Sequence, residues 1–418
     1  MIKRTLLFVA LFSQVMTGFS QPQNDNPYAV ATFECIGIYY KVNSNQLGEC
    51  KVSFRESGAP QWNDTLPLWF DSRDSEYRGS IVGLTPDTEY EIRLTRGGMS
   101  TQLTARTRSE ALKVGKTTYL KPGVLSETVH IKEPGQPDSW HLVMSEVGSK
   151  TTIDPQNTAD YNIVVEAPYV ILRGLELKNA RVHGVLIKEE VHDVVVEACR
   201  ITHWGRSGGS RSFGNVGSSD SAIYAEVGTS RLVLQRNLIE NPRGASNDWD
   251  TGHPSGPQGI TLINSRGGNI IRYNEIISTE DHGFNDAIGG SSNFSFQGSP
   301  NRDSDIYGNL ISNVWDDAIE SEGANMNVRI WGNYIHHTFQ HVAVATTSKG
   351  PLYIFRNVFG LSRRTHKDPL GGNMIKVGQR DEFGGGRRYV FHNTALQPKG
   401  AFRVFSTHVC PNTVTRNN

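Results

Sequence analysis

A single hydrophobic pattern recurs from about Tyr161 to the C-terminus: alternating apolar residues, then Arg or another polar residue, then Asn, then an apolar pair. Alternation with a period of two is typical of a strand with one buried face, so each recurrence predicts short strands separated by turns. We call the Asn place of this pattern the ladder position. In successive recurrences the ladder position is filled by Leu175, Cys199, Asn237, Asn274, Asn309, Asn333, Asn357 and Asn393.

The spacing of the ladder positions indicates a solenoid. The step from position 175 to 199 equals the steps from 309 to 333 and from 333 to 357, and the other steps add a loop-sized insertion to it. A fixed period with such insertions is the signature of a repeat fold. We therefore predict an all-β protein in which residues 161–418 form a right-handed parallel β-helix with rungs of about 24 residues. A β-propeller, with blades of roughly 40–45 residues, does not account for these steps.

The Asn residues of the ladder are predicted to be scaffold. Asn tolerates the left-handed backbone of a bend, and side-chain amides on successive rungs can hydrogen-bond to one another. The pattern returns once more at residues 413–417, where Asn417 follows Asn393 by one full period. The chain would then stop inside a rung, so we expect a truncated product that lacks its C-terminal cap.

Residues 27–108 show the pattern of a small β-sandwich. A turn at Pro86 and Asp87 leads into an alternating strand, and we expect the Tyr90 hydroxyl to bond back to the backbone near that turn. This segment resembles the signature of fibronectin type III domains, which implies such a domain here. Residues 109–160 are then expected to be a linker and the N-terminal cap that a solenoid needs.

The extreme N-terminus predicts export. Two basic residues, an apolar run over residues 6–12 and small residues at 18–20 are typical of a signal peptide, which we assign to residues 1–20. The apolar run is too short to span a bilayer, so we expect no membrane insertion and a periplasmic or extracellular monomer. Export permits a disulfide between Cys35 and Cys50, and two free buried thiols fit the sequence equally well.

Charge and motifs exclude several functions. The chain has 42 basic and 42 acidic residues, so no basic field is present to bind nucleic acid. No P-loop, zinc motif, nucleophile elbow or dinucleotide fingerprint occurs, which disfavours nucleotide use, metalloprotease chemistry and serine hydrolysis.

The register of the repeat places polar residues of successive rungs in columns, about 4.8 Å apart. One column, which precedes the ladder position by two thirds of a period, holds Asp317 and His341, and Asp286 takes the same place if residues 301–305 belong to an inserted loop. A second column, three positions later, runs from Glu320 through Val344 to Lys376, and Asp316 and Glu322 lie beside these columns. Carboxylates one rung apart repel each other, so we expect at least one pKa to rise toward the range of a general acid.

These residues resemble the pectin-lyase-like superfamily of carbohydrate-active β-helices and, more distantly, polygalacturonase-type hydrolases. Those hydrolases carry Asn-Thr-Asp, Asp-Asp, Gly-His-Gly and Arg-Ile-Lys on successive rungs. This chain has Asn285-Asp286, Asp316-Asp317, Gln340-His341-Val342 and Met374-Ile375-Lys376 in the same order. The resemblance implies a catalytic group of Asp286, Asp316 and Asp317, with His341 assisting and Lys376 binding a substrate anion. The glycines beside the histidine and the arginine before Ile375 are absent here.

Inserted loops supply further predicted binding residues, because loops on one face of a scaffold usually carry them. The predicted substrate-binding set is His282, Asn285, Asn293, Arg302, Glu320, Glu322 and Lys376. An aromatic residue such as Trp204, Trp249 or Phe294 could stack on a sugar, and so could Trp62, Trp69 or Trp140, with packing as the favoured interpretation for each.

Three functions fit this pattern. The first is cleavage of an acidic polysaccharide by inverting acid–base hydrolysis, which needs two carboxylates roughly 6.5–9.5 Å apart and no cofactor. The second is a lyase or epimerase in which Lys376 or His341 is the base and Asp316, Asp317, Glu320 and Glu322 hold Ca²⁺, a cation that favours oxygen ligands. The third is a glycan-binding protein without catalysis.

Overall fold

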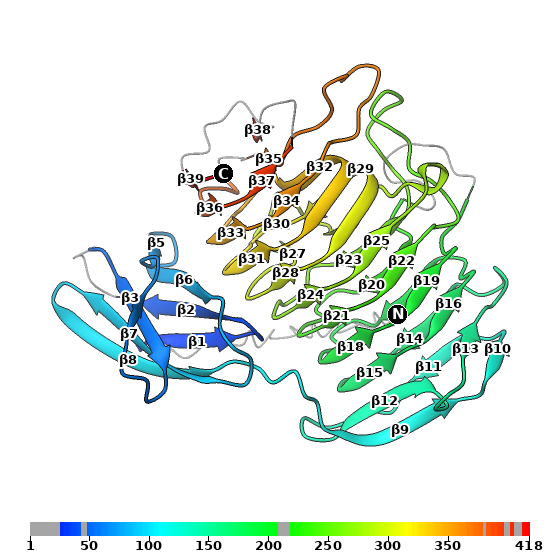
Figure 1. Cartoon of the computed structure of the whole chain (residues 1–418), viewed down its shortest axis with the longest axis horizontal. Helices are drawn as coiled ribbons and strands as arrows, with labels where there is room; N and C mark the ends of the chain where they lie inside the picture. The colour runs from blue at the N-terminus through cyan, green and yellow to red at the C-terminus, as the bar shows by residue number, and fades with distance from the viewer. Residues whose placement is uncertain (1–25, 43–47, 208–217, 379–381, 397–401, 405–411) are drawn as a thin grey trace, which may run out of the picture.

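The computed structural model describes residues 26–42, 48–207, 218–378, 382–396, 402–404 and 412–418. It shows a β-sandwich lying against the side of a parallel β-helix (Figure 1), so the predicted fold class is confirmed. In this part of the chain the helical element is a single 3-10 turn, η1 (Glu280–His282), and no helix has the length and apolarity to cross a membrane. The predicted signal peptide lies outside the described residues.

The sandwich consists of two antiparallel sheets. In sheet order, the first contains β1 (Tyr28–Ala31), β2 (Cys35–Lys41), β6 (Glu76–Val82) and β5 (Trp69–Asp71), and the second contains β4 (Asn63–Asp64), β3 (Lys51–Glu56), β7 (Glu89–Arg96) and β8 (Met99–Arg106). The Tyr90 hydroxyl accepts a hydrogen bond from the Thr85 backbone N–H at 2.9 Å, so the predicted corner bond is confirmed. Cys35 and Cys50 are buried free thiols, and Cys50 belongs to the apolar core of the sandwich.

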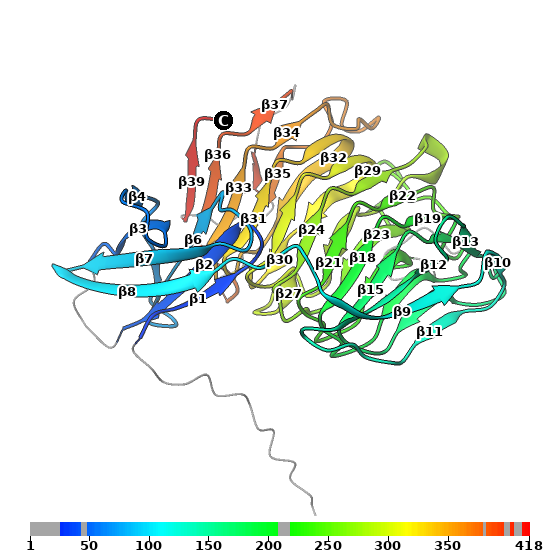
Figure 2. The ribbon, with the colours of Figure 1, turned by 60° about the horizontal axis from the view of Figure 1, so that its bottom comes forward.

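The β-helix repeats three short strands per rung. One strand of each rung belongs to an 11-stranded parallel sheet: β9 (Val114–Leu120), β12 (Trp140–Ser145), β15 (Val170–Arg173), β18 (Val194–Glu197), β21 (Val233–Gln235), β24 (Ile270–Arg272), β28 (Asp305–Tyr307), β31 (Val328–Trp331), β33 (Leu352–Phe355), β36 (Arg388–Phe391) and β39 (Thr413–Arg416). Figures 1 and 2 show these rungs stacked in chain order.

The other two strands of each rung form an 18-stranded parallel sheet. One column of it contains β10 (Gly123–Leu125), β13 (Thr151–Ile153), β16 (Glu176–Lys178), β19 (Arg200–Thr202), β22 (Leu238–Glu240), β25 (Glu275–Ile277), β34 (Val358–Phe359) and β37 (Thr394–Ala395). The other contains β11 (Val129–Ile131), β14 (Tyr161–Val165), β17 (His183–Ile187), β20 (Ser221–Ala225), β23 (Gln258–Leu262), β26 (Ile288–Gly290), β35 (Ile375–Val377) and β38 (Phe402–Val404). In two rungs the columns fuse into the single long strands β29 (Leu310–Glu320) and β32 (Tyr334–Val344). A short antiparallel pair, β27 (Gly298–Ser299) and β30 (Glu322–Gly323), lies beside them.

Parallel pairing begins upstream of the range predicted for the β-helix. Strands β9 to β13 lie within the segment expected to be the linker and N-terminal cap, yet β9 already pairs in parallel with β12. The apolar alternation of this segment is weak, since Val114 and Tyr119 are exposed, and its sequence therefore carries little sign of the stacked strands.

The predicted Asn ladder is present. The Asn333 side-chain carbonyl accepts bonds from the backbone and amide N–H groups of Asn309 at 3.0 and 2.9 Å, and Asn357 does the same for Asn333. The left-handed residue of each bend is the one before the ladder position, such as Gly332 (φ 64°), so the prediction that the Asn itself takes that backbone is wrong. The last rung is also offset by one residue, since Asn418, not Asn417, caps Asn393 at 2.8 Å.

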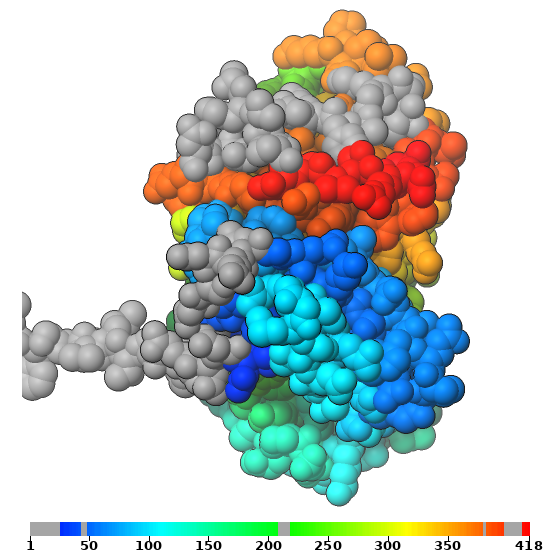
Figure 3. Space-filling view, turned by 90° about the vertical axis from the view of Figure 1, so that its left-hand side faces the viewer, coloured from blue at the N-terminus to red at the C-terminus, as the bar shows by residue number. Residues whose placement is uncertain are grey.

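The sandwich and the β-helix share a polar interface, and Figure 3 shows the sandwich seated against the stacked rungs. The Tyr39 hydroxyl donates to Asp303 at 2.8 Å, and the fully buried Arg329 donates to Asp305 at 2.6 Å and to the Thr32 hydroxyl at 3.1 Å. Buried charges are stable only when they are paired, so separating the two parts would strand these groups. The two parts therefore form one packed unit.

Removing one ladder amide should destabilise the whole stack. In Asn333→Ala the bonds to Asn309, Asn357 and the Ile306 carbonyl at 3.0 Å are lost in a buried setting. We expect the free energy of unfolding to fall by roughly 2–4 kcal/mol in chemical denaturation. Asn63→Ala, at an exposed position, is the matched control and should change it by less than about 0.5 kcal/mol. Equal effects of the two variants would contradict a structural role for the ladder.

Candidate active site

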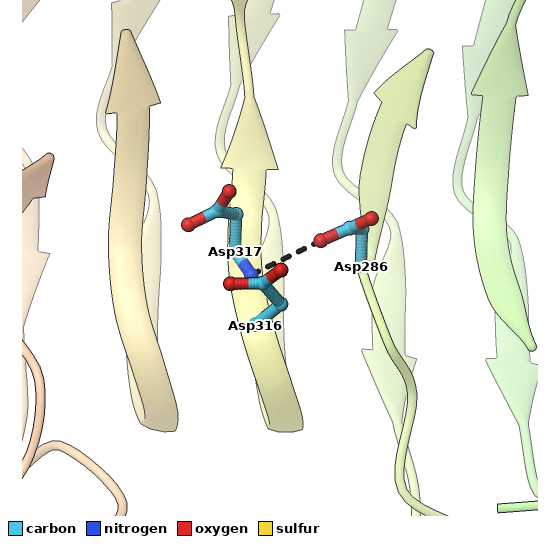
Figure 4. A group of neighbouring side chains, drawn as sticks. All are labelled: Asp286, Asp316 and Asp317. Atoms are coloured by element: carbon cyan, nitrogen blue, oxygen red, sulfur yellow. Dashed lines mark hydrogen bonds between the residues drawn. The ribbon is translucent and has the colours of Figure 1, made fainter. Parts of the chain in front are cut away.

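The predicted carboxylates gather on the fused strand β29, at a local irregularity. Val314 of β29 pairs with Thr338 of β32, whereas Asp317 pairs with Gln340, so β29 carries one more residue than β32 between the two pairs. An extra residue of this kind is a β-bulge, which redirects neighbouring side chains and is common beside active sites. The adjacent Asp316 and Asp317 therefore both approach the Asp286 carboxylate of the preceding rung (Figure 4).

Asp286 is buried and held by three donors. Its carboxylate accepts hydrogen bonds from the side-chain amides of Gln258 at 3.0 Å and Asn285 at 2.7 Å, and from the Asp317 backbone N–H at 3.1 Å. Burial, followed by the charge of Glu320 and of the two aspartates, raises the pKa of Asp286 well above its usual value. Gln258 was not among the predicted site residues, although it occupies the same column one rung earlier and its position was the signal available.

Asp316 and Asp317 are both almost fully buried but have different partners. The Lys376 ammonium lies 2.5 Å from Asp317 Oδ2, and the His253 Nε2 atom lies 3.7 Å from Asp316 Oδ2. Asp316 Oδ1 and Asp317 Oδ1 are buried without a hydrogen-bond partner among the described residues. Burial, followed by the neighbouring Asp317 charge, raises the pKa of Asp316 well above its usual value.

Two glutamates extend the acidic group toward the next rungs. Glu320 accepts a hydrogen bond from the Asn293 amide at 2.9 Å, and Glu322 accepts one from the Ala345 backbone N–H at 2.9 Å. Burial, followed by the charge of Asp317, raises the pKa of Glu320. Burial raises the pKa of Glu322 to about 8 against the opposing effect of Lys376. The direction of these shifts agrees with the prediction, but burial, and not repulsion between the carboxylates, is their largest cause.

Lys376 is the counter-charge of this group. Its ammonium lies 2.5 Å from Asp317 and 3.8 Å from Glu322. Burial alone would lower the pKa of Lys376, but the charges of Asp317 and Glu322 outweigh it and raise that pKa well above its usual value. One lysine against five carboxylates leaves the group short of positive charge.

The group opens into a cleft of about 480 Å³. Seven predicted site residues line it: Asn285, Asp286, Asn293, Asp316, Glu320, Glu322 and Lys376. Asp317 lies beneath them with 1% exposure. Phe294 and the half-exposed His253 also line the cleft, and both come from inserted loops.

His341 is not brought to the cleft, so its predicted catalytic role is not supported. Its ring is fully buried beside Phe359, and its Nε2 atom lies 3.0 Å from the Gly360 carbonyl oxygen. Burial lowers its pKa to about 4. The bulge in β29 explains the error, because Gln340 rather than His341 pairs with Asp317 and a one-residue offset turns a side chain to the other face. The same offset puts Ala343, not Val344, between Glu320 and Lys376.

Two predicted binding residues lie elsewhere. Arg302 belongs to the sandwich interface, where its guanidinium is 5.2 Å from the Tyr39 ring and bonds to Asp303 at 3.2 Å. His282 lies in η1, with its ring 6.4 Å from the ring of His203, and does not line the cleft. Both are close to Asp286 in sequence, but His282 belongs to η1 and Arg302 to the interface with the sandwich.

Three of the six aromatic candidates are packing residues. Trp204 and Trp140 are buried in apolar clusters. The guanidiniums of Arg55 and Arg93 lie 4.6 and 3.9 Å from the Trp62 ring centre, so those cations already contact it. Phe294 is the aromatic candidate that lines the cleft.

The donor set suits a hard cation. Ligand oxygens of Asp286, Asp316 and Asp317 all lie within 4.8 Å of one another, and so do those of Asp317, Glu320 and Glu322. Oxygens that bind one Ca²⁺ at 2.3–2.6 Å are at most about 5 Å apart, so each triplet is compact enough for one ion. The buried, unpartnered oxygens of Asp316 and Asp317 are free to serve as ligands.

The sequence matches no protein-family model and no curated protein. Similar solved structures include pectate lyase Pel9A (14% identity, 74% of each chain covered, TM-score 0.46) and an alginate lyase from Paenibacillus sp. str. FPU-7 (12%, 72% of this chain and 93% of that chain, TM-score 0.44). A thermostable α-1,3-glucanase from Streptomyces thermodiastaticus strain HF3-3 is similar over 93% of this chain and 89% of its own, at 12% identity and a TM-score of 0.30.

Proposed function

We propose that this protein is an exported enzyme that cleaves an acidic polysaccharide by β-elimination, using a divalent cation held in its acidic cleft. The observation that carries the proposal is the gathering of five carboxyl groups at a single cleft with one lysine as their counter-charge. Buried like charges are costly without compensation, and the buried arrangement is best explained by a ligand that supplies positive charge.

The Asp286–Asp316–Asp317 triplet is the proposed cation site. Its oxygens lie within 4.8 Å of one another, and Lys376 makes its ion pairs with Asp317 and Glu322 rather than with Asp286 or Asp316. Ca²⁺ is the best fit because all the available ligands are oxygens. Bound there, it would neutralise a substrate carboxylate and so make the adjacent C–H easier to deprotonate.

The side chains of the cleft have separable roles. Gln258 and Asn285 orient the Asp286 carboxylate through their amides. Lys376 is the proposed base, since it reaches the cleft from the far side of Asp317. Without substrate, Asp317 and Glu322 hold it as an ammonium, so it must release a proton when substrate binds before it can act as the base. Phe294 is placed to contact a sugar ring.

Acid–base hydrolysis is the second candidate, and the raised pKa of Asp316 favours it because a protonated carboxyl is the required general acid. An inverting enzyme, however, needs carboxyl groups roughly 6.5–9.5 Å apart to admit a water. The oxygens of Asp286, Asp316 and Asp317 approach within 4.8 Å, which suits a shared cation better.

Calcium should stabilise the native protein, and Asp316→Asn should lose most of that effect. At a hundredfold excess over Kd a single bound ion adds about 2.7 kcal/mol to the free energy of unfolding. Without calcium, Asp316→Asn should be at least as stable as the native protein, because it removes one like charge. Thermal unfolding with calcium and with chelator measures both quantities. The exposed Glu275→Gln is the control and should keep the full calcium effect; an equal loss in both variants would exclude the triplet as the site.

Cleavage of a uronate polymer should yield unsaturated, ultraviolet-absorbing products, and Lys376→Met should abolish them. Loss of a positioned base costs typically about 10²–10⁴-fold in rate. Absorbance and reducing ends should be followed together on acidic polysaccharides, with and without chelator. Reducing ends without absorbance would favour hydrolysis, and glycan binding without either would favour a non-catalytic role. Calcium stabilisation should survive in Lys376→Met, which separates loss of the base from loss of the ion.

A further inference from the structure

The second carboxylate triplet differs from the first in already holding a positive charge. Oxygens of Asp317, Glu320 and Glu322 lie within 4.8 Å of one another. The Lys376 ammonium lies 2.5 Å from Asp317 Oδ2 and 3.8 Å from Glu322 Oε1, on this side of the group. An ammonium at such distances competes with a bound ion, because both are attracted to the same carboxylate oxygens.

We propose that Asp317, Glu320 and Glu322 form a second divalent-cation site, which the Lys376 ammonium fills in the native protein. This second site rests on the proposed function in one respect only: the native protein is taken to bind one ion at the first triplet, Asp286, Asp316 and Asp317. The two triplets share Asp317, so that carboxylate would bridge the ammonium and the ion in the native cleft.

Hydrogen bonds hold the two glutamates of the second triplet in fixed orientations. Asn293 donates to Glu320 at 2.9 Å and the Ala345 backbone N–H donates to Glu322 at 2.9 Å, so groups from two different rungs fix their directions. Glu322 is 2% exposed, and its Oε2 atom has no hydrogen-bond partner among the described residues. A buried carboxylate oxygen of this kind needs a cation or a proton.

Lysine suits the role of a resident cation. Its ammonium is a compact point charge on a flexible stem, so it can reach Asp317 from β35, two rungs further along the stack. A covalently attached charge is present whatever the concentration of dissolved cations, and it limits the native cleft to one exchangeable ion. Without it, the carboxyl groups of Asp317, Glu320 and Glu322 would have no positive partner, and their oxygens should recruit a second ion.

The test is a count of bound Ca²⁺ by titration calorimetry on the full chain. Lys376→Met should bind one ion more than the native protein, whereas Lys376→Arg, which keeps the positive charge, should bind the same number as the native protein. In the double variant Lys376→Met, Glu322→Gln the additional ion should be lost again. Lys376→Gln is a second uncharged variant for the case in which Lys376→Met does not fold.

The outcome depends on how many more Ca²⁺ ions each variant binds than the native protein. No additional ion in either folded uncharged variant, or an equal gain in Lys376→Arg, would overturn the second site. A native protein that binds no ion would instead overturn the cation of the proposed function, and a gain from zero to one in Lys376→Met would still support the second site. The two failures are therefore distinguishable.

Discussion

Parallel hydrogen bonding between successive rungs decides which side chains of this protein meet. Each rung lies about 4.8 Å from the next, and the ladder of Asn side chains holds the bends of neighbouring rungs in register. Because side chains alternate between the apolar core and the outer face, register determines which polar residues share a column. Asp286 and Asp317 come from segments 31 residues apart, yet the Asp317 backbone N–H bonds directly to the Asp286 carboxylate.

The same rigidity allows the cleft to concentrate negative charge. Strands of a stacked sheet cannot move apart without breaking their hydrogen bonds, so burial, followed by repulsion between neighbouring carboxylates, raises the pKa values of Asp286, Asp316 and Glu320. A site held in this strained electrostatic state is prepared to bind cations. Lys376 compensates only part of the charge, which is the physical basis for assigning an ion to the first triplet.

Much of this arrangement could be predicted because it repeats. The period of the ladder positions, with allowance for inserted loops in two rungs, placed Asp286, Asp317, Glu320 and Lys376 on one face. The prediction for His341 is wrong because the number of residues per rung stays constant while their division between strands and loops changes. The bulge at Asp316 adds one residue to β29, and the loop that follows β29 is one residue shorter than its counterpart after β32. The two changes leave the length of the period unaltered, so the sequence gives no sign of the one-residue shift that turns His341 inward. Arg302 was misplaced for a different reason: only the packed sandwich shows that its partners are Tyr39 and Asp303.

The central claim is that the carboxylates of β29 and the preceding rung bind a cation. Anomalous X-ray scattering from crystals soaked in Mn²⁺, a substitute that also accepts oxygen ligands, tests it most directly. We predict a peak in contact with carboxylate oxygens of Asp286, Asp316 and Asp317. A cleft without a peak at saturating Mn²⁺, or a peak only at sites outside it, would contradict this account.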